Sequence, residues 1–159
     1  MTSQDLDAID RRLAAALQED CRLSTAALAD RAGLSPSACH RRIKLLEDKG
    51  VIDRYAAVLN GEAIGYAMEF IVEVTLKSQA DKTMSAFEQA VAAAPEILEC
   101  VLMSGDNDYL MRIAARDVKD YERIHRDVLA PAPGVDRIKS SLALRIVKPR
   151  KGYPVAVGH

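Results

Sequence analysis

The chain has no tryptophan, two phenylalanines and three cysteines among its 159 residues, and its apolar runs are short. A membrane-spanning helix needs about 20 consecutive apolar residues, so the sequence predicts no span and no membrane partner. Residues 1–5 are polar and acidic, unlike the apolar core of a secretory signal. The three cysteines are odd in number and lie far apart in the sequence, so they indicate neither a disulfide framework nor a zinc site. These absences predict a soluble, cytoplasmic protein that holds no metal.

Acidic and basic residues nearly cancel, with 22 Lys+Arg against 23 Asp+Glu and a formal net charge of −1. Nucleic-acid-binding domains usually carry a basic surface, and the overall balance gives no sign of one. Residues 1–60 contain nine basic and nine acidic side chains, so this part is neutral as well. Any basic surface must therefore come from the placement of charges on one structural element.

The first sixty residues carry the spacing and the end signals of short helices. Apolar residues recur at helical intervals. Ser24 and Ser35 are typical N-caps, Pro36 suits the first position of a helix, and Gly33 can end a helix by adopting a positive φ. The predicted helices cover residues 5–19, 25–32 and 36–49. A short strand over residues 51–59 is expected to follow.

The third predicted helix has two different faces. Cys39, Ile43 and Leu46 are spaced to face the other two helices, and Gly33 permits the sharp turn of a helix-turn-helix. The opposite face carries hydrogen-bonding or cationic side chains and no acid, namely Ser37, His40, Arg41 and Lys44. Such a helix fits the major groove of DNA and can present donors to bases and phosphates. The alternative is an ordinary solvated helix face.

From residue 67 the apolar period changes to that of a mixed sheet and helix domain. Strands and helices alternate in the order βαββαβ, which is the ferredoxin-like arrangement. The predicted elements cover residues 67–77, 84–94, 97–104, 109–115, 118–129 and 135–147. Both helices would cover one face of the sheet, and the other face, with Ile71, Thr75, Ala143 and Val147, needs a cover. A second copy of the chain can supply it, so we expect a homodimer.

Several short strings give the chain a family resemblance. They are LDAID at 6–10, LSP at 34–36, CHRRI at 39–43, LE at 46–47, GVIDRY at 50–55, GDNDY at 105–109 and PGV at 133–135. In this order they resemble the Lrp/AsnC (feast/famine) transcription regulators along essentially the whole chain.

The resemblance implies an α+β protein. It combines an N-terminal winged helix-turn-helix domain (residues 1–59), a hinge (60–66) and a C-terminal ferredoxin-like (RAM/ACT-like) βαββαβ domain (67–148). The second domain would sense a ligand and form dimers, and the tail (149–159) is expected to be loosely held. The implied partners are double-stranded DNA, a small-molecule effector such as an amino acid, and further copies in a homodimer that assembles into an octamer.

The same resemblance, together with the helix face, nominates the DNA-binding residues. These are Ser35, Ser37, His40, Arg41, Arg42 and Lys44. Arg42 matches an arginine of the family and is expected to hold a phosphate or an internal acid rather than to read a base.

In the family, the loop between the second and third strands of this domain and a Ser/Thr on its last strand line an effector pocket between dimers. The matching residues here are Ser104, Gly105, Asp106, Asn107, Asp108, Tyr109 and Ser140. Asp106 or Asp108 could meet an α-ammonium group while backbone N–H groups of the loop meet a carboxylate. From the residues alone, the alternative of a hydrated turn is favoured.

Other function classes find less support. No catalytic residues are expected, because the three histidines fall on separate elements and no nucleophile, P-loop or dinucleotide motif occurs, which also leaves no cofactor. An RNA-binding domain of this topology needs a pair of aromatic residues on its middle strands, and the sequence lacks that pair. A stand-alone metabolite-sensing oligomer without a DNA role remains the alternative function.

Overall fold

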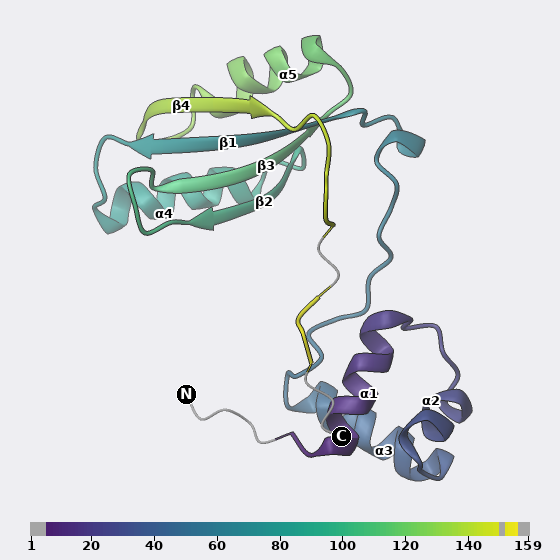
Figure 1. Ribbon diagram of the computed structural model, residues 1–159. Helices are drawn as coiled ribbons and strands as arrows, with labels where there is room; N and C mark the ends of the chain where they lie inside the picture. The colour runs from purple at the N-terminus through teal and green to yellow at the C-terminus, as the bar shows by residue number, and fades with distance from the viewer. Residues whose placement is uncertain (1–5, 150–151, 156–159) are drawn as a thin grey trace. The chain divides into compact units, whose positions relative to one another are not determined.

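The computed structural model describes residues 6–149 and 152–155, and it divides into two compact units (Figure 1). The helical unit comprises the described residues up to Ala57 together with the described part of the tail from Lys148. The sheet unit comprises Val58–Val147. We use these two names below.

The helical unit contains the three predicted helices. They are α1 (Ala8–Glu19), α2 (Thr25–Ala32) and α3 (Pro36–Asp48). Ser24 and Ser35 cap α2 and α3 as predicted, and Gly33 has the expected positive φ of 70°. The predicted start of the first helix at Asp5 lies outside the described residues, and Asp7 is the N-cap of α1. Its carboxylate accepts the N–H groups of Ile9 and Asp10.

The core of the helical unit forms where the apolar faces of the helices meet. Its buried side chains are Leu13, Ala16, Leu28, Ala29, Ala32, Cys39 and Leu46. Burial also raises the pKa of the Cys39 thiol, because the thiolate would lose its hydration. The predicted inward face of the third helix is therefore confirmed.

The strand predicted over residues 51–59 is wrong. This segment has no strand pairing and leads into a short 3₁₀ turn at Glu62–Ile64. A strand requires a hydrogen-bonded neighbour, and the described ladders of this chain join only the four strands of the sheet unit. These residues therefore form no strand and no wing within the described part of the chain.

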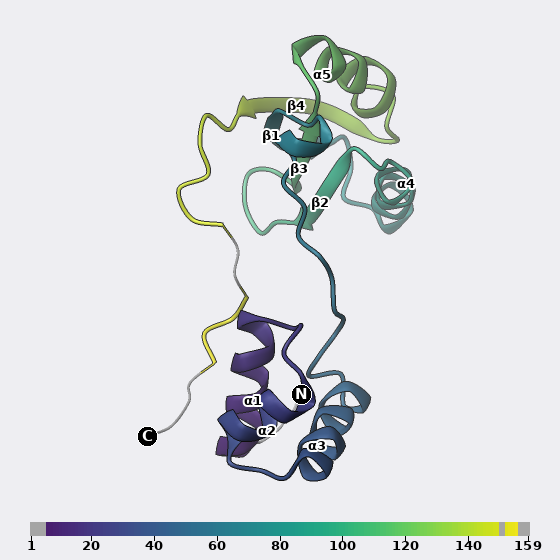
Figure 2. The same cartoon turned by 90° about the vertical axis from the view of Figure 1, so that its right-hand side faces the viewer.

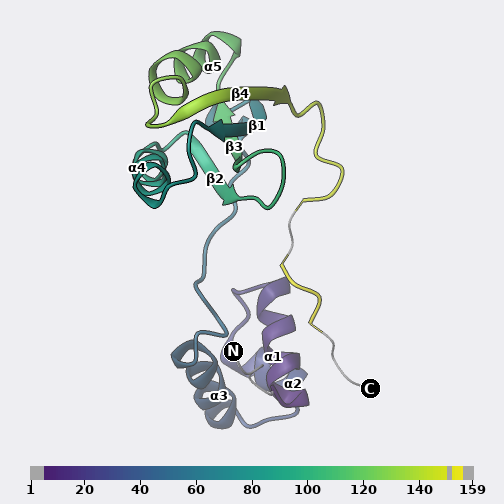
Figure 3. The same ribbon diagram turned by 90° about the vertical axis from the view of Figure 1, so that its left-hand side faces the viewer.

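The sheet unit has the predicted βαββαβ order. Its elements are β1 (Met68–Leu76), α4 (Asp81–Ala92), β2 (Ile97–Leu102), β3 (Tyr109–Ala115), α5 (Val118–Ile124), which continues as a π-helical turn (His125–Leu129), and β4 (Val135–Leu142). The described strands pair antiparallel in the order β2-β3-β1-β4. Figure 2 and Figure 3 show α4 and α5 on the same side of this sheet.

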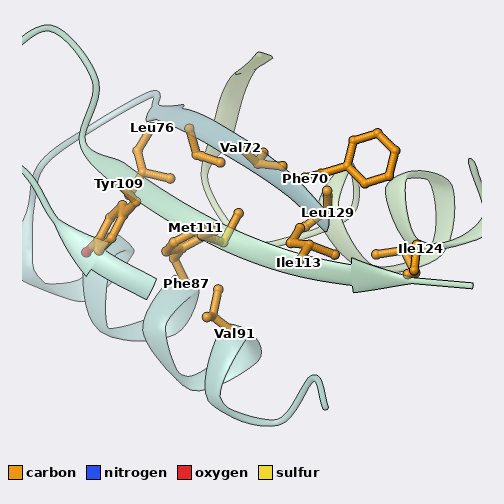
Figure 4. Close-up of a cluster of buried hydrophobic side chains, with 12 residues drawn as sticks. Phe70, Val72, Leu76, Phe87, Val91, Tyr109, Met111, Ile113, Ile124 and Leu129 are labelled. Atoms are coloured by element: carbon orange, nitrogen blue, oxygen red, sulfur yellow. The ribbon is translucent and has the colours of Figure 1, made fainter. Parts of the chain in front are cut away.

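The core of the sheet unit lies between the sheet and these two helices (Figure 4). Alternate residues of β1 are buried on this side, as the period of two predicted. Val72, Met111 and Ile113 are at most 1% exposed. Phe87 of α4 and Ile124 of α5 meet them from the helix layer. Burying each such side chain contributes about 1.5–3 kcal/mol.

The last strand is shorter than the predicted range of 135–147. It ends at Leu142, which pairs with Phe70, and one further hydrogen bond joins Ala143 N–H to Glu69 O. Beyond this point β1 offers no partner, because β1 begins at Met68. Val147, expected on the open face, therefore lies past the sheet, as do Leu144 and Ile146. None of the helices in the described part of the chain is long and apolar enough to cross a membrane.

Candidate nucleic-acid interface and ligand loop

The start of α3 is fixed by hydroxyl groups. The Ser35 Oγ accepts the N–H of Ala38 at 3.3 Å and lies 3.2 Å from the Ser37 Oγ. Gly33, in the left-handed conformation, makes the sharp turn between α2 and α3. Ser35 therefore positions the helix, while Ser37, two residues further along, lies on the exposed surface.

One side of α3 is exposed and free of acids from Pro36 to Lys44. Its exposed polar side chains are the four that the spacing predicted, Ser37, His40, Arg41 and Lys44. Cys39 and Leu46, on the other side, are at most 2% exposed. Glu47 and Asp48 are exposed as well, but they occupy the C-terminal end of the helix. The exposed polar side chains from Ser37 to Lys44 are thus donors and cations of the kind that contact base edges and phosphates.

Arg42 belongs to a different contact. Its Nη1 lies 2.7 Å from Asp7 Oδ2 and 2.8 Å from Asp10 Oδ1, both on the first helix. The N–H of Asp10 and the Arg42 guanidinium lower the pKa of the Asp7 carboxyl, and the two carboxylates raise the pKa of Arg42. The internal acids Asp7 and Asp10 are therefore the partners of Arg42.

Replacing Arg42 with methionine should make the helical unit less sensitive to acid. The pKa of Asp7 is lower in the folded state, so its contribution to stability is full above the unfolded pKa and is lost as pH falls through the folded pKa. Without the guanidinium this pKa lies closer to its ordinary value, and less stability is lost between about pH 5 and pH 2. Thermal unfolding followed by circular dichroism measures the slope. The exposed control Arg41→Met should keep the wild-type slope, and an unchanged slope in Arg42→Met would contradict the assignment.

A hollow of about 280 Å³ lies beside α3, and the spacing of residues in the sequence did not predict it. Its lining includes His40, Lys44 and Glu47 of α3 and Tyr55 of the following segment. The Tyr55 hydroxyl donates to Glu47 Oε1 at 2.9 Å. Burial and this acidic neighbour raise the pKa of Tyr55 to about 12. Periodicity could not have found this contact, because Tyr55 lies outside any helix or strand.

The loop between β2 and β3 holds two carboxylates in different environments. Asp108 is 6% exposed. Its Oδ2 accepts the N–H of Leu76 at 2.7 Å, and its Oδ1 accepts the side-chain amide of Gln79 at 2.6 Å. Asp106 is exposed. Asp108 therefore holds the end of β1, and Asp106 is the loop carboxylate that faces solvent.

Two further loop residues also have partners within the unit. Asn107 donates to Glu73 Oε2 at 3.0 Å. Tyr109 is 1% exposed, and its hydroxyl donates to Glu88 Oε1 at 2.7 Å. Burial is the largest cause that raises the pKa of Tyr109, and the hydrogen bond to Glu88 raises it further. Ser104, Gly105 and Asp106 form the exposed part of the loop.

Ser140 does not meet the loop within one chain. It pairs with Val72 on the helix side of β4, where its Oγ hydrogen-bonds the Tyr121 hydroxyl. β1 separates β4 from β3, which places the two strands about 10 Å apart. The predicted effector residues thus form two groups in different parts of the sheet unit. Within the described residues, no group of His, Cys, Asp and Glu side chains is arranged to hold a metal ion.

A compact helix-turn-helix with an exposed cationic face, joined to a ferredoxin-like sheet unit, defines a two-part DNA-binding regulator. Comparison with known protein families supports this class of protein. Residues 6–47 match the AsnC-type helix-turn-helix domain, and residues 69–153 match the Lrp/AsnC ligand binding domain. The chain belongs to the Lrp/AsnC family, whose members are transcriptional regulators.

Curated relatives match over nearly their full length. The Bkd operon transcriptional regulator of Pseudomonas aeruginosa is 36% identical, covering 95% of this chain and 99% of the relative. The leucine-responsive regulatory protein of Escherichia coli K12 is 37% identical, covering 91% and 88%. A transcriptional regulator of Neisseria meningitidis, solved as an L-Met complex, superposes with a TM-score of 0.89 at 33% identity, covering 94% and 96% of the two chains.

Proposed function

We propose that this regulator contacts double-stranded DNA through the exposed face of α3 from Ser37 to Lys44. The exposed, acid-free set Ser37, His40, Arg41 and Lys44 is the observation that carries the proposal. Ser35, as the cap, sets the start of the helix and can add a contact to a phosphate. The protein would work in the cytoplasm, where its DNA partner is found. An electrophoretic mobility shift with DNA from upstream of its own gene tests this function against a metabolite sensor that does not bind DNA.

The effector proposed for the sheet unit is an amino acid. The match to a ligand-binding domain and the neisserial relative solved with L-Met support this class. The exposed Asp106 is the group suited to an α-ammonium, and the backbone of Ser104 and Gly105 is suited to the carboxylate. Asn107, Asp108 and Tyr109 would shape the loop through their internal hydrogen bonds. Ser140 would join the site only from a neighbouring copy.

A cognate amino acid should raise the melting temperature of the protein. A ligand at a hundred times its dissociation constant stabilises the folded state by ~2.7 kcal/mol, which corresponds to several degrees for a chain of this length. The twenty amino acids can be screened by circular dichroism, because the chain has no tryptophan. Asp106→Ala should abolish the shift. A shift of the same size in Asp106→Ala would place the ammonium site elsewhere.

The proposed assembly is a homodimer that associates further into an octamer. Its basis is the face of the sheet that α4 and α5 do not cover. This face combines half-buried Ile71 with two ion pairs, Arg112 to Glu69 and Lys139 to Glu73. The Nε of Arg112 is buried and has no hydrogen-bond acceptor within the described residues, which suits an interface that supplies one. Leu98 and Leu102 on the edge strand β2, both more than half exposed, suit contacts between dimers.

Changing Ile71 to aspartate should weaken dimerisation by about a hundredfold or more, because an unpaired charge would be buried in the interface. Sedimentation velocity of the full chain measures the change. Val118 on α5 is 63% exposed, away from the open face, and Val118→Asp is the matched control. A wild-type protein that sediments as a monomer at micromolar concentration would contradict the proposed assembly.

A further inference from the structure

The tail of the chain is attached to the first helix by a pair of hydrogen bonds. The Gln18 side-chain amide donates to Tyr153 O at 2.7 Å, and the N–H of Tyr153 donates to Gln18 Oε1 at 3.0 Å. The two bonds use both polar side-chain atoms of Gln18 and both the N–H and the C=O groups of Tyr153. This is how an amide side chain pairs with an extended backbone. It differs from the loosely held tail that the sequence predicted.

The residue before Tyr153 is suited to this contact. Gly152 has a φ of 107°, a conformation that side chains with a Cβ rarely adopt. A Cβ at this position would collide with the Gln18 amide group, which would have to leave its hydrogen-bonded position. Val155, two residues after Tyr153, is partly buried. The positive φ of Gly152, its close approach to Gln18 and the two hydrogen bonds of Tyr153 thus all support this attachment.

We propose that the surface of α1 around Gln18 is a docking site for the C-terminal segment 152–155 of the same chain. The chain leaves the helical unit after Ala57, forms the sheet unit and returns to the helical unit at Lys148. Docking therefore attaches the C-terminal segment, which follows β4 in the sequence, to the first helix of the same chain. We call the segment 152–155 the strap.

Amide hydrogen exchange at Tyr153 in the full chain tests the docking. Removing both hydrogen bonds by Gln18→Ala should speed exchange at this amide by about tenfold or more. Gly152→Ala should do the same, because the added Cβ displaces the glutamine. Two controls should leave the amide protected, namely Gln89→Ala on α4 and Gly65→Ala, where φ is also positive but a Cβ would meet nothing. An amide of Tyr153 that exchanges at the unprotected rate in the wild type would overturn the proposal.

Mixed oligomers decide whether the strap docks within its own chain. This step rests on the homodimer proposed above. A chain that ends before Gly152 is co-purified, through two different tags, with a full-length Gln18→Ala chain. The intact tail of the second chain can then dock only on the Gln18 of the first chain. We expect Tyr153 to stay unprotected. Restored protection would overturn docking within one chain, and failure to recover a mixed oligomer would count against the homodimer while the single-chain exchange result stands.

Discussion

Replacing Arg41 and Lys44 together with alanine should reduce the affinity for cognate DNA by about a hundredfold or more. Both side chains are exposed on the acid-free face of α3 between Ser37 and Lys44, so each can contact a base edge or a phosphate. If Lys44 meets a phosphate, the slope of log affinity against log salt should shrink by about one unit. The fold should not depend on either residue, because exposed substitutions change the stability by within about 0.5 kcal/mol. Fluorescence anisotropy over a salt series and thermal unfolding measure the two effects.

The matched control removes the same charge from the sheet unit. Lys82 on α4 and Lys119 on α5 are exposed, so Lys82→Ala/Lys119→Ala changes the net charge equally without altering α3. Its DNA affinity should stay near that of the wild type. Equal losses in both double variants would indicate a general charge effect, and an unchanged affinity in the α3 variant would refute the proposed contact face.

Replacing Asp108 with alanine should lower the free energy of unfolding by about 1–3 kcal/mol. The carboxylate is 6% exposed and accepts the N–H of Leu76 and the amide of Gln79, so its removal leaves a buried donor at the end of β1 without an acceptor. Asp106→Ala, only two residues away but exposed, should stay within about 0.5 kcal/mol of the wild type. Urea unfolding followed by circular dichroism gives both values.

The contrast between the two aspartates separates structure from ligand binding. Asp108→Ala should be less stable with or without an amino acid, whereas Asp106→Ala should lose only the ligand-dependent part. Equal stabilities of Asp108→Ala and the wild type would mean that the hydrogen bonds to Leu76 and Gln79 contribute little, and Asp108 would then be a candidate for the ammonium as well.

Local signals explain why most elements could be predicted from the sequence. Ser24, Gly33 and Ser35 act within a few residues of the helix ends that they fix. The end of β4 depends instead on where its partner β1 begins, more than sixty residues earlier, and no local pattern records that register. The segment 51–59 shows the same limit, because its alternation suits a strand but no neighbouring strand pairs with it.

The candidate sites divide in the same way. The exposed face of α3 follows from helical spacing alone, and His40, Arg41 and Lys44 lie where that spacing put them. The partners of Arg42 and Asp108 lie 29 to 35 residues away in sequence, so the sequence could name these residues but not their contacts. The attachment of Tyr153 to Gln18 spans 135 residues, and no sequence signal pointed to it.

Sequence-specific recognition of DNA is the central claim, and binding-site selection tests it most directly. Random duplexes are recovered with the purified full-length protein and sequenced over several rounds, in parallel with the Arg41→Ala/Lys44→Ala variant. We predict that the wild type enriches one motif, arranged as two half-sites related by two-fold symmetry as expected of a dimer, and that the variant loses it. Recovery of unrelated sequences by the wild type, or enrichment of the same motif by the variant, would contradict this account.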